Sequence, residues 1–443
     1  MNGQNPRQIA ARVLTRRRHG GEYTENLLEN ALSDARLSSA DCGLCQEIVY
    51  GVVRWQAALD WLIARKTGGR EQKPALQNLL RLGLYQIFWL DKIPPHAAVH
   101  ETVELAKQNG FGPQAGFVNA ILRGYLREAD ETKKLLDELK KSRPALGWSH
   151  PEWLVEKWQK QFGNEKTRQL LEWNNTPPKT FARVNPLKTD AGKLVERWRE
   201  ENVEYDFFTR DWTGENLVFE LKSHPPLNSL ASFRDGRFYI QDPSTLLAAR
   251  ELGAQPGETI LDLCAAPGGK TTFIAQLMNN EGKIVACDIA EERLKLVQEN
   301  CARLGVTCVE IQRVADILSA KQTEIISASG TLAARFDRIL VDAPCSNTGV
   351  LRRRVDLRWR ISPGEISRLQ QAQLDLLKLA ATKLKPGGIL VYSTCSLEPE
   401  ENGGVVQQFL REQGNFKLEN ERQLLPFADN VDGAFVARLE KTL

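Results

Sequence analysis

The sequence predicts a multidomain protein: an all-α bundle over residues 1–140, a small α+β module over 145–240 and an α/β domain over 241–443. Three observations support this division. A chain of 443 residues is too long for one ordinary hydrophobic core. Apolar residues recur at helical spacing up to about residue 128. Beyond Asp242, short apolar runs alternate with amphipathic segments, which is typical of a doubly wound parallel sheet with helices on both faces.

The first part of the chain has a helical pattern throughout. Its most apolar segment runs from Leu79 to Leu90 and ends at Ile93-Pro94-Pro95. A second apolar series follows from Val99 to Leu122, and the charged stretch 127–141 predicts a helical linker. These segments together predict a bundle with its own core.

The second part combines one helix with short strands. An amphipathic helix is expected over Pro151–Phe162. Strands are expected at Phe181–Asn185, Leu217–Leu221 and Phe238–Ile240. This content fits a small α+β module.

The third part alternates strands and helices. Strands are expected at Thr259–Leu263, Ile284–Cys287, Cys308–Gln312, Phe336–Val341 and Ile389–Ser393. Helices are expected at Lys270–Met278, Glu291–Leu304 and Pro363–Leu384. The last helix has Ser362 as its N-cap and Glu365 as a capping-box acid, and Lys385-Pro386-Gly387-Gly388 is expected to end it.

Composition predicts a soluble globular protein, with 42% hydrophobic and 26% charged residues. No apolar run reaches the roughly 18 residues that a membrane span needs, so we expect no membrane association. Eight sparse cysteines predict a reducing cytoplasm rather than a disulfide scaffold. The basic clusters Arg16-Arg17-Arg18 and Arg352-Arg353-Arg354 are candidate RNA contacts, with a solvated face as the alternative.

The segment from Ile260 to Thr271 combines a strand, a turn of small residues and the start of a helix. Gly268 and Gly269 would let a ligand approach the backbone, and the helix start offers free N–H donors. A P-loop is excluded because Cys264 stands where its first glycine is required. The dinucleotide fingerprint G-x-G-x-x-G is also absent. A nucleoside site with a different turn remains.

Three aspartates follow successive strands of the predicted sheet. Asp288 stands where such sites bind ribose hydroxyls, and Asp316 could accept from the exocyclic amine of adenine. Asp342 ends the fourth strand. Carboxylates in these places suit a cofactor that offers hydroxyl groups, an amine and a cationic centre. They do not suit a cofactor with a negatively charged pyrophosphate. The pattern therefore favours S-adenosylmethionine over NAD or ATP, with surface or helix-capping roles as the alternative for each aspartate.

Two cysteines come directly after predicted buried strands. Cys345 closes the run Asp342-Ala343-Pro344-Cys345, and Cys395 closes Ser393-Thr394-Cys395. The carboxyl ends of parallel strands converge on the ligand crevice of an open α/β sheet. Two thiols brought to one crevice of a cytoplasmic protein indicate chemistry rather than a structural bridge.

These segments resemble three signature motifs of the RNA (cytosine-5) methyltransferases, in that family's order and separations: Leu263–Thr271, Asp342–Ser346 and Ser393–Ser396. The resemblance implies a Rossmann-like class I methyltransferase domain. It implies that Cys395 attacks the base and that Cys345 assists release. The cofactor-binding residues that it implies are Cys264, Ala265, Ala266, Pro267, Gly268, Gly269, Lys270, Asp288, Asp316 and Asp342. The chemistry makes Asp342 the candidate partner of the cytosine ring, through its amino group or protonated N3.

The first part of the chain resembles a NusB-type RNA-binding domain through residues 93–99 and 117–123. Phe181–Asn185 resembles the segment that opens the small RNA-binding module of the same methyltransferases. A NusB-like domain ahead of such an enzyme is the arrangement of the RsmB/Sun (Fmu) family, which modifies small-subunit (16S) ribosomal RNA. The resemblance implies ribosomal RNA as the partner, and we expect a monomer. Val355 departs from that family, which often has proline there.

Two other functions stay open on sequence grounds: the same chemistry on transfer RNA, and an inactive RNA-binding assembly factor. Methylation of an amino group is disfavoured, since Asn/Asp-Pro-Pro-aromatic is usual after the fourth strand of those enzymes and Asp342-Ala343-Pro344-Cys345 stands here. No metal site is expected from Cys42-x-x-Cys45 or from His96 and His100. The remaining thiols are expected to be small buried hydrophobes: Cys264, Cys287, Cys301 and Cys308.

Overall fold

The computed structural model describes residues 5–19, 21–313 and 336–442. The chain forms two compact units. The first consists of Met1–Thr176 and Leu351–Arg360, and the second of Pro177–Val350 and Ile361–Leu443. Asp316, one of the predicted cofactor residues, lies outside the described residues.

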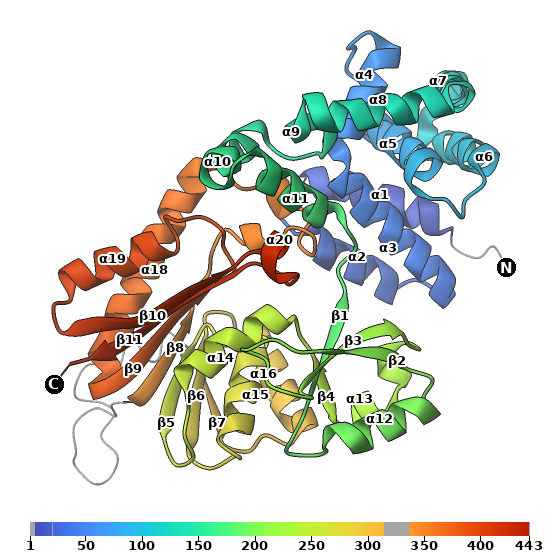
Figure 1. Ribbon diagram of the computed structural model, residues 1–443. Helices are drawn as coiled ribbons and strands as arrows, with labels where there is room; N and C mark the ends of the chain where they lie inside the picture. The colour runs from blue at the N-terminus through green and yellow to red at the C-terminus, as the bar shows by residue number, and fades with distance from the viewer. Residues whose placement is uncertain (1–4, 20, 314–335, 443) are drawn as a thin grey trace. The chain divides into compact units, whose positions relative to one another are not determined.

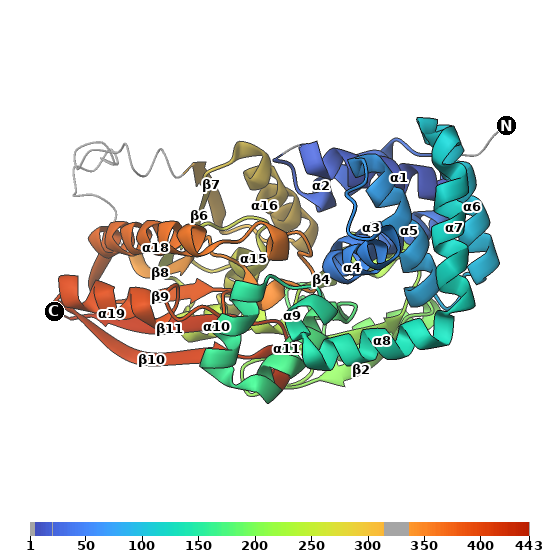
Figure 2. The same ribbon diagram turned by 90° about the horizontal axis from the view of Figure 1, so that it is seen from above.

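The first unit is helical, as predicted (Figure 1). Its elements are α1 (Pro6–His19), α2 (Thr24–Ser33), α3 (Ser39–Arg54), α4 (Gln56–Thr67), α5 (Pro74–Trp89), α6 (Pro95–Ala106), η1 (Lys107–Phe111), η2 (Gly112–Gln114), α7 (Ala115–Arg127), α8 (Ala129–Ser142), α9 (Pro144–Gly147), α10 (Glu152–Phe162) and α11 (Asn164–Asn175). Helices α5 and α6 begin with proline, whose missing N–H would be unpaired there anyway. Figures 1 and 2 show α6 and α7 side by side.

The core of this unit depends on a close approach of α3 and α5. Gly51 lies against the ring of Tyr85, and a Cβ at Gly51 would come within 1.9 Å of that ring. The Tyr85 hydroxyl donates to Glu47 Oε1 at 2.5 Å, which satisfies its only polar atom. Any larger residue at position 51 would therefore displace the Tyr85 ring from its place against α3.

The segment Leu351–Arg360 belongs to the helical unit, although in sequence it lies within the α/β domain. Arg358 is fully buried. Its guanidinium donates to Asn174 O and Asn175 Oδ1, both at 2.9 Å, and to Arg54 O at 3.2 Å. Burial, with a smaller contribution from the charge of Arg54, lowers the pKa of Arg358.

Three other residues of the same segment join it to the bundle. Asp356 accepts from the Thr24 N–H at 2.5 Å and pairs with Arg17. Val355, the departure from the family pattern, is buried in the bundle core. Arg352 is 1% exposed, with its guanidinium 4.0 Å from the centre of the Trp173 ring. The interpretation of Arg352 as an exposed RNA contact was therefore wrong.

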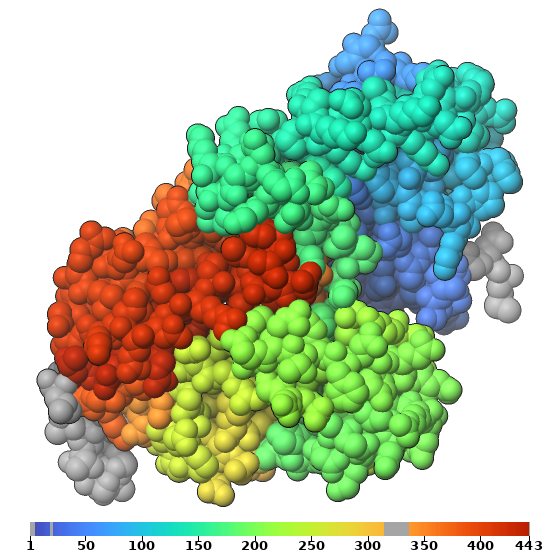
Figure 3. All heavy atoms as spheres, viewed as in Figure 1, coloured from blue at the N-terminus to red at the C-terminus, as the bar shows by residue number. Residues whose placement is uncertain are grey.

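The second unit opens with a four-stranded antiparallel sheet in the order β2-β3-β1-β4. Its elements are β1 (Thr180–Val184), α12 (Ala191–Glu200), β2 (Glu204–Phe208), β3 (Val218–Ser223), η3 (Leu227–Ser229), α13 (Ala231–Arg234) and β4 (Phe238–Ile240). Ala182 and Phe219 pack on Trp198 of α12, whereas Phe181 and Val218 join the core of the following domain. Figure 3 shows these green and yellow segments in continuous contact.

The rest of the second unit is built on a seven-stranded sheet in the order β10-β11-β9-β8-β5-β6-β7. Its elements are η4 (Pro243–Thr245), α14 (Leu246–Leu252), β5 (Thr259–Leu263), α15 (Gly269–Leu277), β6 (Lys283–Asp288), α16 (Glu291–Leu304), β7 (Val309–Arg313), β8 (Phe336–Asp342), η5 (Thr348–Val350), α18 (Pro363–Lys383), β9 (Leu384–Thr394), α19 (Gly403–Glu412), β10 (Phe416–Leu424), α20 (Pro426–Asp429) and β11 (Ala434–Lys441). Strands β5 to β9 pair in parallel, whereas β11 pairs antiparallel with β9 and with β10.

Helices cover both faces of this sheet. Successive side chains of a strand point to opposite faces, so the apolar residues of each central strand contact helices on both sides. Ile260 and Leu340 pack with α14, α15 and α16 on one face. Leu261 and Ile339 pack with α18 and α19 on the other, and Figure 1 shows the sheet between these two layers. No helix among the residues that the structure describes is long and apolar enough to cross a membrane.

The sheet differs from the predicted one in its later strands. It is mixed rather than wholly parallel, since β10 and β11 were not predicted. Strand β9 begins at Leu384 rather than at Ile389, so Lys385–Gly388 lie in the strand. Strand β2 was also missed. Strands β2 and β10 leave most of their residues exposed or half-buried, so their sequences lack the apolar run that identifies a buried strand.

Candidate active site

The predicted nucleoside turn follows β5 and opens α15. Cys264 has φ 65° and Gly268 has φ 100°, so the chain reverses through two residues in the left-handed region. A Cβ on Gly268 would lie 3.2 Å from the Val297 backbone. The Ala265 N–H donates to Cys287 O at 2.8 Å, which holds the turn at the end of β6.

Asp288 ends β6 beside this turn and is 2% exposed. Its Oδ2 accepts from the Ala266 N–H at 3.2 Å, and its Oδ1 accepts from the Ile289 N–H at 2.8 Å. Arg293 pairs with Oδ1 at 3.3 Å. Next to this polar site, Ile289 leaves 77% of its surface exposed. The turn therefore offers a carboxylate and an apolar side chain side by side.

Asp342 ends β8 and is held by residues of two other elements. Lys270 Nζ donates to its Oδ2 at 2.8 Å, and the Ser393 hydroxyl donates to its Oδ1 at 3.0 Å. Burial by itself would lower the pKa of Lys270. The charge of Asp342 and its hydrogen bond, with smaller contributions from Cys395 and Asp262, together outweigh burial and raise the pKa. Lys270 is therefore a fixed cation at the ends of the strands.

The two predicted thiols are in contact. Cys345 Sγ lies 3.3 Å from Cys395 Sγ, and the Cys395 thiol donates to Asn347 Oδ1 at 3.0 Å. The hydrogen bond with Cys395, together with burial, raises the pKa of the Cys345 thiol. The carboxyl ends of the adjacent parallel strands β8 and β9 thus bring both thiols and Asp342 to one place.

Family models match most of the chain. They are the 16S rRNA methyltransferase RsmB/F model at residues 249–440, the NusB family model at 4–127 and the ferredoxin-like domain of RsmF/B-like methyltransferases at 150–210. A probable ribosomal RNA small subunit methyltransferase B of Bacillus subtilis (strain 168) is 35% identical, over 100% of both chains. This chain belongs to the RsmB/F methyltransferase family. The predicted family and the predicted NusB-like domain are confirmed.

Two solved structures resemble this RsmB/F-family chain. The crystal structure of PH0851 is 25% identical, covers 99% of each chain and has a TM-score of 0.76. The crystal structure of NSun6 from Pyrococcus horikoshii with SFG is 25% identical. It covers 66% of this chain and 98% of its own, with a TM-score of 0.56. The predicted combination of helical bundle, α+β module and methyltransferase domain is confirmed.

Two buried polar residues of this methyltransferase escaped the sequence analysis. Asp262 lies inside β5, accepts from the Thr271 hydroxyl at 2.6 Å and has its pKa raised to about 7 by burial. Arg183 of β1 is fully buried, donates to Gly269 O at 2.9 Å and has its pKa lowered to about 9 by burial. A charged residue inside an apolar strand was the available signal for both.

The other cysteines are not alike. Cys287 and Cys301 are buried, as predicted, whereas Cys264 and Cys308 are only half-buried because each lies just outside a strand. Burial raises the pKa of Cys45 to about 11. Among residues 5–19, 21–313 and 336–442, no three His, Cys, Asp or Glu side chains are grouped to hold a metal ion.

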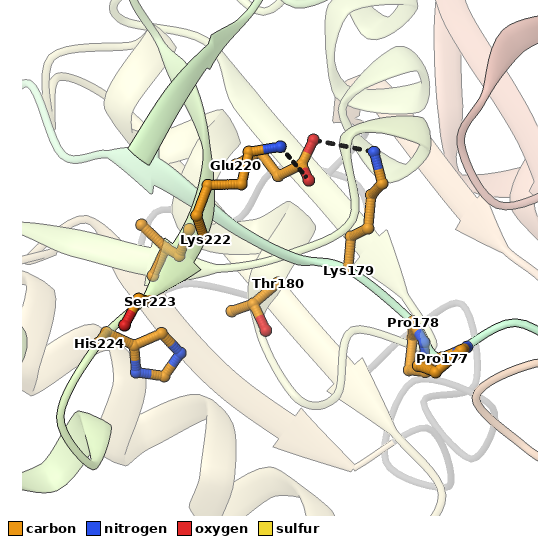
Figure 4. Close-up of a pocket in the computed structure, with 9 residues that line it drawn as sticks. Pro177, Pro178, Lys179, Thr180, Glu220, Lys222, Ser223 and His224 are labelled. Carbon is orange, nitrogen blue, oxygen red and sulfur yellow. Dashed lines mark hydrogen bonds and ion pairs between the residues drawn. The ribbon is translucent and has the colours of Figure 1, made fainter. Parts of the chain in front are cut away.

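A hollow of about 520 Å³ lies on the α+β module, away from the residues that the sequence indicated. Figure 4 shows Glu220 between two lysines that line it. Lys179 Nζ lies 3.0 Å from Glu220 Oε2, and Lys222 Nζ lies 2.7 Å from Oε1. Lys222 Nζ also lies 3.0 Å from Asp206 Oδ2, so two carboxylates offset the charges of the two lysines.

Proposed function

We propose that this protein transfers a methyl group from S-adenosylmethionine to carbon 5 of a cytosine in small-subunit (16S) ribosomal RNA, through a covalent adduct with Cys395. The observation that carries the proposal is the contact of two thiols, 3.3 Å apart, beside the Lys270–Asp342 pair. The match to the 16S rRNA methyltransferase RsmB/F model supports the choice of RNA.

Cytosine needs a nucleophile because its carbon 5 is unreactive toward alkylation. The thiolate of Cys395 adds to carbon 6, and the electron pair of the C5–C6 double bond moves to carbon 5. Carbon 5 then takes the methyl group, which S-adenosylmethionine supplies from its sulfonium. A base then takes the C5 proton, the electron pair of that C–H bond re-forms the C5–C6 double bond, and the C6–S bond breaks to return the Cys395 thiolate. We assign assistance in this last step to Cys345, which contacts the departing sulfur.

Lys270 and Asp342 can assist the attack on the cytosine ring. Lys270 pairs with Asp342 at 2.8 Å and interacts electrostatically with Cys395, so its positive charge lies close to the sulfur that attacks the base. Asp342 binds Lys270 and Ser393 and keeps further lone pairs. Those lone pairs can accept from the cytosine amino group or pair with protonated N3, which draws electron density away from carbon 6. The base must leave its stack to reach both groups.

The residues around the turn fit S-adenosylmethionine. Asp288 is held by the Ala266 and Ile289 N–H groups and keeps lone pairs for ribose hydroxyls. The exposed Ile289 next to it offers an apolar surface for a flat base. Gly268 has no side chain to block the turn, and its φ of 100° suits glycine. The other cofactor residues of this proposal form the same turn: Cys264, Ala265, Ala266, Pro267, Gly269 and Lys270.

The NusB-like bundle is our candidate for RNA affinity, since its family model matches residues 4–127. Arg16 and Arg354 are exposed and can displace counterions from phosphates. Deleting residues 1–140 is a poor test of this role, because Val355 and Asp356 pack against that part of the chain. Substituting Arg16 and Arg354 by Gln should instead weaken the salt-dependent part of RNA binding. We expect the protein to act as a cytoplasmic monomer.

Substituting the two cysteines tests the chemistry. Cys395→Ser removes the attacking thiolate, so methylation of 16S RNA should stop and no adduct should form. Cys345→Ala leaves attack possible but impairs release, so protein joined to RNA should accumulate as a slow band in a denaturing gel that ribonuclease removes. Reversed phenotypes would make Cys345 the nucleophile. Activity of both variants without any adduct would overturn the covalent route.

The same assay separates the alternative functions. Transfer RNA transcripts measured beside 16S RNA identify the substrate by relative kcat/KM. An RNA-binding assembly factor would bind 16S RNA and show no methyl transfer from labelled S-adenosylmethionine with any RNA. That last result would refute the proposed function.

A further inference from the structure

Glu401 is a fully buried carboxylate in the loop that follows β9. Its Oε1 accepts from the Ser346 N–H at 2.8 Å and from Gln373 Nε2 at 3.1 Å. Its Oε2 accepts from the Ser396 hydroxyl at 2.5 Å and from the Ser346 hydroxyl. Both oxygens are therefore satisfied by hydrogen bonds from neutral groups.

The two serines connect Glu401 to the thiols. Ser346 follows Cys345 in the chain, and Ser396 follows Cys395. The two hydroxyls lie 3.0 Å apart on the same carboxylate oxygen. Glu401 thus binds one residue next to each cysteine, although the two loops come from different strands.

A buried carboxylate is costly to keep. Ionised carboxylates lose several kcal/mol of hydration on burial unless an opposite charge or several hydrogen bonds compensate. All four donors to Glu401 are neutral, so its stabilisation comes from hydrogen bonds alone. Fold stability does not need such a group, because neutral residues could fill the same volume. A function in placing the two loops explains it better.

We propose that Glu401 is a positioning residue that sets the distance between the Cys345 and Cys395 thiols by binding Ser346 and Ser396. Glu401 does not touch the reacting atoms. It holds the two loops in register, so that the thiol that attacks and the thiol that assists release meet the same base. The catalytic part of this inference rests on the proposed function, whereas the part about geometry does not.

The fold makes this testable without unfolding the site. The loops are also joined by the Gly349 N–H, which donates to Cys395 O at 2.9 Å, and by the Ala343 N–H, which donates to Ser393 O at 2.9 Å. Removing the Glu401 side chain should loosen the thiols while these backbone bonds keep both loops in place.

The experiment compares Glu401→Ala, Glu401→Gln and a matched control, Glu201→Gln. Glu201 also accepts from the N–H and hydroxyl of one serine, Ser232, but it lies in the α+β module. In Glu401→Gln the amide oxygen can keep the Ser346 N–H and Gln373, and its NH₂ group can donate to the two hydroxyl oxygens. Glu401→Gln should therefore rescue most of what Glu401→Ala loses.

The first readout is the formation of a Cys345–Cys395 disulfide with diamide, followed by peptide mass spectrometry. The two thiols give two electrons and two protons to diamide, which becomes the hydrazine. Glu401→Ala should form this disulfide at least about tenfold more slowly than wild type, whereas Glu201→Gln should match wild type. Equal rates in Glu401→Ala and wild type would overturn the proposal, whether or not the protein methylates RNA.

The second readout is methylation at saturating RNA. Glu401→Ala should lower kcat about 100-fold, the cost of a displacement of about 1 Å between reacting groups. The affinity for S-adenosylmethionine should not change, because Glu401 is not among the residues of the nucleoside turn. The wild-type protein could fail to methylate RNA while its disulfide formation still depends on Glu401. That result would refute the proposed function but would support the role of Glu401 in positioning the two thiols. An unchanged kcat in Glu401→Ala would refute its catalytic part.

Discussion

Arg358 anchors the segment Leu351–Arg360 to the other helices of the first unit through its hydrogen bonds to Asn174 and Asn175. The substitution Arg358→Met removes these bonds. The substitution keeps the apolar stem of the buried side chain and deletes the guanidinium. Two hydrogen bonds at 2.9 Å, to Asn174 O and Asn175 Oδ1, are lost, together with a longer one to Arg54 O. A hydrogen bond from a charged group contributes about 1.5–3 kcal/mol, and the unfavourable burial of the charge offsets part of this. We therefore expect a local destabilisation of about 2–4 kcal/mol.

Native-state hydrogen exchange of segment Leu351–Arg360 measures this effect directly, since a chain of two compact units need not unfold in two states. A loss of 2–4 kcal/mol corresponds to exchange that is about 30- to 700-fold faster, at about tenfold per 1.4 kcal/mol. Arg360→Met is the matched control. Arg360 donates to Gly21 O at 2.7 Å and to Glu22 O, but its side chain is 27% exposed. Water can replace these bonds, so Arg360→Met should change the exchange rates less than Arg358→Met.

Consequences for catalysis follow from the chain connectivity. Cys345 stands on the same loop as this segment, a short distance upstream. Under the proposed function, Arg358→Met should lower kcat while the affinity for S-adenosylmethionine stays at the wild-type value. Exchange rates of Leu351–Arg360 that are the same in Arg358→Met and wild type would refute the assignment of this residue as the anchor.

Two further predictions concern Asp288 and Asp262, which lie in the strands next to the predicted nucleoside turn. Asp288→Ala should weaken S-adenosylmethionine binding by about 1–3 kcal/mol, because ribose hydroxyls would lose their acceptor; unchanged affinity in calorimetry of the folded variant would contradict this. Burial raises the pKa of Asp262 to about 7, so the folded state binds its proton more tightly than the unfolded state and stability falls as pH rises from about 4 to 7. Asp262→Asn cannot ionise, so its stability relative to wild type should increase by about 3–4 kcal/mol over that range and level off above pH 7. Denaturant unfolding at several pH values measures this, and a pH-independent difference would show that Asp262 does not titrate there.

The sequence indicated that the two thiols would lie together because strand ends are local features. Apolar runs end at Asp342 and at Thr394, and parallel neighbours must share an edge, so Cys345 and Cys395 were expected in one place. The structure places them 3.3 Å apart. The same reasoning located Asp288 and the Gly268 turn. It failed for β2 and β10, whose faces are too exposed to leave an apolar pattern.

By itself, then, the amino-acid sequence determined the helical bundle, the alternating strands and helices, the family motifs and which residues stand at the strand ends. Only the tertiary structure decided which polar side chains meet: Lys270 with Asp342, Arg358 with Asn174, and Glu401 with Ser346. The physical reason is that periodicity records whether a residue is buried but not what it binds. Buried charges choose partners far away in the chain, and those partners are known only once the backbone has brought them within hydrogen-bonding distance.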